Sequence, residues 1–301
     1  MMEANGEVKA NNASLVELIP YSSQLVVLEI SVPSICYLPK ELHFSNSNFR
    51  FRINISINDI PGSDGSLDER YLFENSLKLE VEDASDLGEH QTIRSLLKNA
   101  VVLNLDIEKN WKHIWFEKEE KEILPCNLKC LTINRCEDLE YLLEATSDST
   151  PPNTFHLLES LSLHYLPRLI GICKSTDSVE VEREGSSAST TVTHKLFSSN
   201  TILWVPNLKR LIVGDCGSLE VVFDLEGLKV KENRKPILAV LSELKLWDLS
   251  WMSIDIDKCH SLRNLLSASI ANTTRFNTFT GDCSSLAIHD KSLANIYPSD
   301  F

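Results

Sequence analysis

The chain has 301 residues, 43% of them hydrophobic, so it is long enough to bury a large core. Its 29 basic and 43 acidic residues give a net charge of −14, which argues against nucleic acid as a partner because phosphate neutralisation dominates such binding. The same charge disfavours an anionic membrane surface. No segment of the sequence has the roughly 18 to 20 consecutive apolar residues of a membrane span.

Residues 1–14 are polar and lack the apolar stretch of a secretory signal. We therefore expect a disordered N-terminal tail and a cytoplasmic protein, with the folded part beginning at residue 15.

From there an apolar pattern recurs along the chain. Residues 127–142 (NLKCLTINRCEDLEYL) and 207–222 (NLKRLIVGDCGSLEVV) share their apolar positions, and residues 157–172 keep them. Each unit contains a core pair, two apolar residues separated by one other. The gaps between successive pairs are mostly 24 to 33 residues, the range of leucine-rich repeats, with two exceptions of 50 and 10. The nine pairs are Leu28/Ile30, Ile53/Ile55, Leu77/Leu79, Leu103/Leu105, Leu131/Ile133, Leu161/Leu163, Leu211/Val213, Leu244/Leu246 and Ile254/Ile256.

The spacing within a unit predicts its shape. Alternation with period two in the core pair is typical of a strand with one buried face, and the apolar residues that follow at intervals of three carry the chain back. We predict an α/β leucine-rich-repeat solenoid over residues 15–270, a horseshoe with a short-stranded parallel sheet on its concave face and an irregular convex side. Residues 271–301 are expected to form a degenerate C-terminal tail without a convincing cap.

The two exceptional gaps have separate explanations. Residues 175–195, inside the 50-residue gap, are rich in Ser, Thr and Glu and predict a disordered insert. The 10-residue gap before Ile254 is too short for a unit and suggests that a segment has been lost.

The cysteines fit the repeat better than they fit a metal site. Cys136, Cys216 and Cys259 each follow the second member of a core pair by three residues, where a small buried side chain would close the turn. Cys126, Cys130 and Cys136 lack the spacing of a zinc knuckle. We expect no metal, no cofactor and no catalytic site.

Residues that alternate with the core pairs should face solvent on the concave sheet. Lys129, Lys209 and Lys245 are predicted to align in three units and to form a basic stripe for an acidic surface. Protection of an exposed strand edge is the alternative role for these lysines. The candidate partner-binding residues are Lys129, Thr132, Asn134, Arg135, Ser162, His164, Tyr165, Lys209, Asp215, Lys245, Trp247 and Asp248.

Several segments of the chain resemble the repeat region of plant nucleotide-binding leucine-rich-repeat disease resistance proteins of the coiled-coil type. The similarity is carried by residues 25–42 (LVVLEISVPSICYLPKEL), 158–169 and 205–228. No phosphate-binding G-x-x-x-x-G-K-[ST] loop is present, so the nucleotide-binding domain of that family is lacking.

The resemblance implies a non-catalytic protein-interaction solenoid in plant defence. Its partner would be a pathogen effector, a guarded host protein or the nucleotide-binding domain of the parent receptor, which it would hold inactive. Two alternatives remain open. One is a substrate-recruiting adaptor for a ubiquitin ligase, although residues 1–24 are too short and polar for an F-box-like segment. The other is a non-functional, truncated receptor remnant, which the 10-residue gap and the fading of the pattern towards the C-terminus favour.

Overall fold

The structure is a computed structural model of the full chain. It describes residues 15–42, 44, 46, 48–57, 71, 74–87, 90–116, 127–144, 155–174, 194–224, 240–247, 252–255, 264–266, 276–280 and 287–288.

Short strands dominate the described elements. The helical elements are the 3-10 helices η1 (Leu15–Gln24), η2 (Ile35–Tyr37), η4 (Ala84–Leu87) and η7 (Thr201–Trp204) and the α-helix α1 (Gln91–Asn99). The strands are β1 (Val27–Val32), β2 (Arg50–Ile55), β3 (Ser76–Asp83), β4 (Val102–Lys109), β5 (His113–Phe116), β6 (Cys130–Asn134), β7 (Tyr141–Glu144), β8 (Ser160–His164), β9 (Gly171–Lys174), β10 (Lys195–Phe197), β11 (Arg210–Gly214), β12 (Val221–Phe223), β13 (Glu243–Trp247), β14 (Met252–Asp255), β15 (Asn264–Leu266), β16 (Phe276–Thr280) and β17 (Ala287–Ile288).

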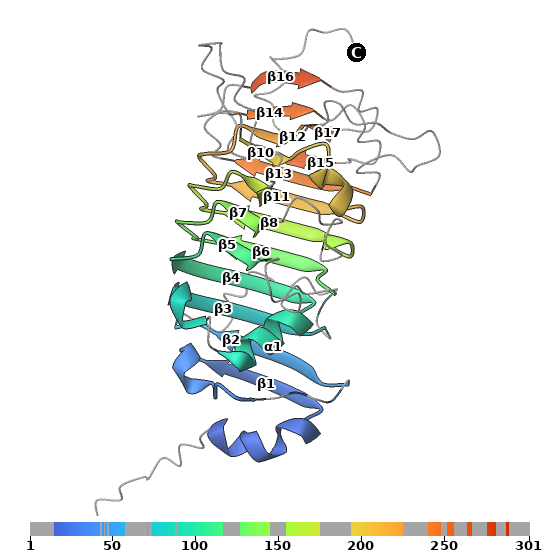
Figure 1. Ribbon diagram of the computed structural model, residues 1–301. Coiled ribbons are helices and arrows are strands. Elements are labelled where there is room, and N and C mark those ends of the chain that lie inside the picture. Colours follow the sequence, from blue (N-terminus) through green and yellow to red (C-terminus); the bar gives the residue numbers. More distant parts are fainter. Residues whose placement is uncertain are drawn as a thin grey trace, which may run out of the picture.

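The core pairs build one parallel sheet. Within the described residues, ten strands pair in the order β1-β2-β3-β4-β6-β8-β11-β13-β15-β17. The core pairs from Ile53/Ile55 to Leu244/Leu246 are buried and lie opposite one another from strand to strand. Figure 1 shows these strands stacked in chain order in an elongated column. The prediction of a leucine-rich-repeat solenoid with a large parallel sheet is therefore confirmed.

Two predicted core pairs are wrong. In β1 the partners of Ile53 and Ile55 are Ile30 and Val32, so the first pair is displaced by two residues from Leu28/Ile30. Since positions 28, 30 and 32 are all apolar, periodicity alone does not fix this register.

Ile254 is misassigned for a similar reason. It lies in β14, which pairs with β12 and β16 in a second sheet, whereas the sheet of core pairs continues at Leu265. Leu265 follows Leu244 by 21 residues, an ordinary return path. The inference of a lost segment therefore fails, and the remnant alternative loses one of the two observations that favoured it. The sheet also includes β15 and β17, and β16 and β17 lie beyond residue 270.

The opposite side of the coil, the back side, changes character along the chain. It carries α1 in the first units and then the strands of two further sheets, β5-β7-β9 and β10-β12-β14-β16. A helix is about 10 Å wide whereas strands lie about 4.8 Å apart, so units with strands on both sides stack without fanning out. This arrangement favours the elongated column of Figure 1. The curvature of a horseshoe stays a prediction.

The 50-residue gap adds one strand to the back side. β8 pairs directly with β11, but β10 lies between β9 and β12 on the back. Lys195, the last residue of the predicted insert, belongs to β10, and its Nζ bonds Asp224 at 2.6 Å. Residues 175–193 lie outside the described residues.

The core is continuous inside the coil, from Leu28 to Leu246. Cys136 and Cys216 are buried in it, as the repeat pattern predicts, and burial raises the pKa of each thiol to about 12. The equivalence of Cys259 rested on Ile254/Ile256 and fails with it; Cys259 lies outside the described residues. At the N-terminal end η1 packs Leu15 and Leu18 against the core, a partial cap that we did not predict.

Candidate functional site

The front face is defined here as the side chains of the ten-stranded sheet that alternate with the core pairs. Three parallel rows cross it, because the strands are in register. One row contains Val102, Cys130, Ser160 and Arg210, the next Asn104, Thr132, Ser162, Ile212 and Lys245, and the third Glu80, Asp106, Asn134, His164 and Gly214.

A backbone ladder fixes the units to one another just before each strand. The carbonyl oxygen of Lys129 accepts the N–H groups of Glu159 and Ser160, at 2.8 and 3.0 Å, and that of Glu159 accepts those of Lys209 and Arg210. The carbonyl of Lys209 in turn accepts from Ser242 and Glu243. The residue equivalent to Lys129 and Lys209 in the last of these units is therefore Ser242.

The predicted basic stripe is therefore wrong. Lys245 lies opposite Ile212 in the middle row, and Glu159 separates Lys129 from Lys209. The lysines are also paired with carboxylates. The Nζ atoms of Lys129, Lys209 and Lys245 lie 2.7, 2.8 and 2.6 Å from the carboxylates of Glu74, Glu159 and Glu243.

Protection of a strand edge does not explain these lysines either. β6, β11 and β13 are interior strands of the sheet, with a paired strand on each side. Lys129 and Lys209 instead alternate with Glu159 just before the strands, and each of the three lysines forms an ion pair with a carboxylate.

The residue after each of three strands has left-handed backbone geometry. Arg135, Tyr165 and Asp215 have φ values of 55°, 53° and 55°. The N–H of Arg135 donates to the carbonyl of His164, and that of Tyr165 to the carbonyl of Gly214, so this turn also joins neighbouring units. A bulky residue with such a φ is strained, and strain of this kind gathers at functional sites.

Among these three turn residues, Tyr165 is the one with an aromatic ring. Its side chain is 57% exposed at the margin of the front face. His164 beside it is half-buried, and burial lowers its pKa although the charge of Asp215 acts in the opposite direction. The imidazole is therefore biased towards its neutral form.

Arg135 is held by two carboxylates of earlier units. Its Nε lies 3.0 and 2.8 Å from the carboxylate oxygens of Asp106, and Nη2 donates to Asp106 at 2.6 Å and to Glu80 at 3.3 Å. The amide of Asn134 donates to Asp106 at 3.3 Å, and the hydroxyl of Ser56 bonds Glu80. Burial raises the pKa of Asp106, and the hydrogen bonds of Arg135 offset part of that effect. The network ties four successive units together.

The candidate residues thus separate into three groups. Thr132, Asn134, Ser162 and His164 lie on the front face as predicted, although Ser162 is buried. Lys129, Arg135 and Lys209 hold units together, whereas Lys245 pairs with Glu243 of its own strand. Tyr165 and Asp215 lie at the margin. Trp247 lies in β13 opposite Gly214, and Asp248 lies outside the described residues.

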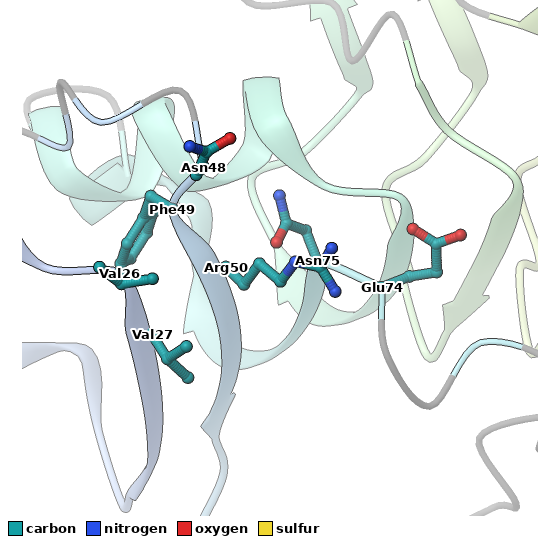
Figure 2. A pocket seen from close by; sticks show the side chains of 7 residues that line it. All are labelled: Val26, Val27, Asn48, Phe49, Arg50, Glu74 and Asn75. Atoms are coloured by element: carbon teal, nitrogen blue, oxygen red, sulfur yellow. The ribbon is translucent and has the colours of Figure 1, made fainter.

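A pocket of about 480 Å³ opens beside the N-terminal ends of β1, β2 and β3. Figure 2 shows Val26 and Phe49 on one side of it and Asn75 between Arg50 and Glu74 on the other. The amide of Asn75 accepts from the N–H of Phe51 at 3.1 Å and donates to the carbonyl of Asn99 at 3.2 Å. The polar wall of the pocket therefore connects neighbouring units. None of the predicted partner-binding residues lines this pocket.

In the part of the chain that the structure describes, no three His, Cys, Asp or Glu side chains come together as a metal site would require. Nor does any described helix have the length and apolarity needed to cross a membrane.

Stacked parallel strands around a continuous core, with rows of outward side chains in register, define a leucine-rich-repeat solenoid, a class that typically serves as a protein-interaction module. Residues 187–253 match the profile of a family described as "Plant disease resistance protein RPS2-like, leucine-rich repeats". The match supports a leucine-rich-repeat region of a plant disease resistance protein and a non-catalytic role. No curated protein sequence matches the chain.

Sequence reasoning missed Glu80, Asp106, Tyr71, Glu74 and Glu159. Glu80 and Asp106 follow the core pairs Leu77/Leu79 and Leu103/Leu105 as Asn134 follows Leu131/Ile133, so extending the pattern to the first half would have found them. Tyr71 carries no such signal, because its partner Glu159 is 88 positions away.

Proposed function

We propose that the front face of β6, β8 and β11, with the margin at Tyr165, is a protein-binding surface in plant defence. The partner that we propose is a pathogen effector, a guarded host protein or the nucleotide-binding domain of a parent resistance receptor, met in the cytoplasm. In the last case binding would keep the receptor inactive, as in receptors of the coiled-coil type. The family match over residues 187–253 supports this role, since it includes β11.

The exposed ring of Tyr165 carries the proposal. Tyrosine is enriched at the energetic centres of interfaces, because it buries a large rigid area and keeps a polar tip. Tyr165 is 57% exposed on a strained backbone, where a smaller residue would be accommodated more easily. Folding alone therefore gives no reason for a large aromatic residue at this position.

The surroundings of Tyr165 suit a partner that lies along the sheet. Thr132 and Ser162 are small and uncharged and lie in the middle row, which leaves room for an approaching surface. Arg135 and Asp215 occupy the turns on either side of Tyr165 in neighbouring units. Such an aromatic centre with a charged rim is typical of protein interfaces.

Site-specific photocrosslinking in plant cells tests the proposal. A photoreactive phenylalanine is placed at position 165 or, as a matched control, at position 37. Tyr37 is 60% exposed, much like Tyr165, but lies in η2 directly after β1, at the end of the sheet and far from β8. We expect a discrete protein adduct at position 165 that is absent at position 37, and expect the captured protein to bind the purified chain. Adducts of the same protein at both positions, or no binding after purification, would contradict the proposal.

A further inference from the structure

Exposed apolar side chains gather at the N-terminal end of the ten-stranded sheet. In the part of the chain that the structure describes, seven of the eleven exposed large hydrophobic residues belong to residues 15–57. Val26, directly before β1, and Val27, its first residue, are 55% and 60% exposed, and Val16 in η1 is 58% exposed. Figure 1 shows η1 and β1 at this end of the column. A gathering of this kind marks an interaction surface, whereas scattered apolar residues need no explanation.

The core is also less closed at β1 than at the next strand. Ile30 and Val32 lie opposite Ile53 and Ile55 of β2. Ile53 and Ile55 are 1% and 0% exposed, whereas Ile30 and Val32 are only half-buried although η1 packs against the same core. The end units of a solenoid normally carry a polar cap, so a half-open apolar end indicates that a further layer covers it.

The backbone of β1 presents an edge for pairing. β1 is the first strand in the order of the sheet, and β2 is its one partner among the described strands. The carbonyl oxygens of Val26 and Val32 accept from N–H groups at the start of β2 and directly after it. Because these groups alternate along a strand, the carbonyls of Val27 and Glu29 point away from β2. The strand, VLEISV, contains neither the lysine nor the proline that commonly blocks such an edge.

The charges at this end suit a second copy of the chain. Residues 15–57 contain three acidic and three basic residues, whereas the whole chain has a net charge of −14. Two copies can therefore approach through this end without the repulsion that the excess of acidic residues causes elsewhere. The six charged residues are Glu17, Glu29, Glu41, Lys40, Arg50 and Arg52.

The chain offers no better strand for this edge close by in its sequence. Residues 1–14 are polar and contain a single β-branched residue, Val8. Since strands are enriched in β-branched and aromatic residues, this segment is not suited to pair with β1.

We propose that two copies of this chain pair edge to edge through β1 in an antiparallel, twofold-symmetric dimer. A register centred on Ile30 places Leu28 opposite Val32 of the second copy, so apolar side chains meet on the core side of the sheet. This register also keeps the two Glu29 carboxylates from lying directly opposite one another, which would destabilise the pairing. The contact is isologous, and its twofold axis is perpendicular to the sheet, so both front faces lie on the same side of the dimer. The dimer does not depend on the proposed function.

Light scattering after size-exclusion chromatography tests the dimer on the full chain. From low to high micromolar concentrations, the mass should rise from 34.0 kDa towards twice that value. Amide hydrogen exchange should locate the contact, because exchange in β1 slows as the concentration rises while exchange in β6 stays unchanged.

Glu29→Pro removes an N–H group that faces away from β2, and an edge strand tolerates proline in this orientation. Two hydrogen bonds are lost in a symmetric dimer, so we expect dimerisation to weaken about tenfold. Glu29→Ala is the matched control, because it also removes the ion pair with Arg52 but keeps the N–H. Its dimerisation should stay within about threefold of the native value.

Val27→Lys is a second variant that leaves the buried core untouched, since Val27 is 60% exposed. A lysine on the edge should also weaken the dimer about tenfold. Leu157→Lys changes another exposed apolar residue, just before β8, and should leave the dimer within about twofold of the native value.

A chain that stays monomeric over the whole range of concentrations would overturn the dimer and leave the edge of β1 to a different protein. Assembly into species larger than a dimer would contradict the twofold contact. The β1 pairing would also be wrong if Val27→Lys, or a folded Glu29→Pro variant, dimerised as well as its matched control. None of these results bears on the photocrosslink at position 165, so failure of the dimer and failure of the proposed function are distinguishable.

Discussion

Tyr165 combines exposure with left-handed backbone geometry, and this combination has a measurable consequence. A left-handed conformation costs a residue with a Cβ atom about 1 kcal/mol, which glycine avoids. We predict that Tyr165→Gly is about 1 kcal/mol more stable than Tyr165→Ala in urea unfolding.

At Thr132, in the extended strand β6, the order should reverse, with glycine about 0.5 to 1 kcal/mol less stable than alanine. Equal stability of the two variants at position 165 would show that the backbone there is unstrained.

Arg135 is predicted to act in folding as much as in recognition. Arg135→Ala leaves Asp106, which is 9% exposed, beside Glu80 without its main partner. Because Arg135 itself is half exposed, we expect a loss of about 1 to 3 kcal/mol of unfolding free energy, below the value for a fully buried pair.

The matched change Arg52→Ala breaks the exposed pair with Glu29 and should cost about 0 to 1 kcal/mol. Addition of Asp106→Asn to Arg135→Ala should recover part of the loss. Similar losses for the two arginines would argue that Asp106 does not need Arg135.

At the scale of elements, the junction of β9 and β10 depends on a glycine. A Cβ atom at Gly171 would lie 2.7 Å from the backbone oxygen of Lys195, so Gly171→Ala must displace one strand. We expect a loss of about 1 to 3 kcal/mol, with faster hydrogen exchange in β10.

Gly217→Ala is the control, because no atom lies within 4 Å of the corresponding Cβ position. It should change stability by less than about 0.5 kcal/mol. If Gly171→Ala were equally neutral, the close packing of β9 against β10 would be wrong.

The attachment of α1 is predicted to depend on pH. Nδ1 of His90 accepts from the N–H of Ile93 at the start of the helix, while Nε2 lies 3.1 Å from the carbonyl oxygen of Leu38. Burial lowers the pKa of His90 below its ordinary 6.5, so the unfolded chain binds the proton more readily than the folded chain. This contribution to stability is complete above pH 6.5 and is lost as the pH falls below it.

Urea unfolding between pH 7.5 and 5.5 measures this effect. His90→Asn keeps an acceptor for the helix start and should flatten the loss towards pH 5.5. His156→Asn, at an exposed position, should leave the profile of the native chain unchanged. A profile that is the same with and without His90 would contradict the assignment.

For the whole molecule, local periodicity predicts the fold well and the pairing of units less well. The pairs from Ile53/Ile55 to Leu244/Leu246 could be predicted from the sequence because their apolar residues alternate with period two, and these apolar residues are the buried ones. Leu28/Ile30 and Ile254/Ile256 could not be assigned in this way. The first lies in a strand with three alternating apolar residues. The second has the apolar pattern of a front strand, but Ile254 lies in β14 on the back side.

The candidate site shows the same limit. Tyr165 and Thr132 follow from strand alternation, whereas the partners of the lysines do not. Glu159 occupies the place between Lys129 and Lys209, and the contact from Tyr71 to Glu159 closes a loop far longer than any local pattern. The charges of Lys129 and Lys209 are therefore satisfied by carboxylates of other units, whereas Lys245 pairs with Glu243 of its own strand.

Binding at the front face is tested most directly by the affinity of the protein captured at position 165, measured by calorimetry with the purified chain. Tyr165→Ala should weaken binding about tenfold or more, since a central aromatic residue contributes over 1 kcal/mol. Tyr37→Ala, which changes an equally exposed tyrosine beside β1 at the end of the sheet, far from β8, should leave the affinity within about twofold. A loss of affinity with Tyr37→Ala but not with Tyr165→Ala would show that the partner binds elsewhere and that the front face is not the interaction surface.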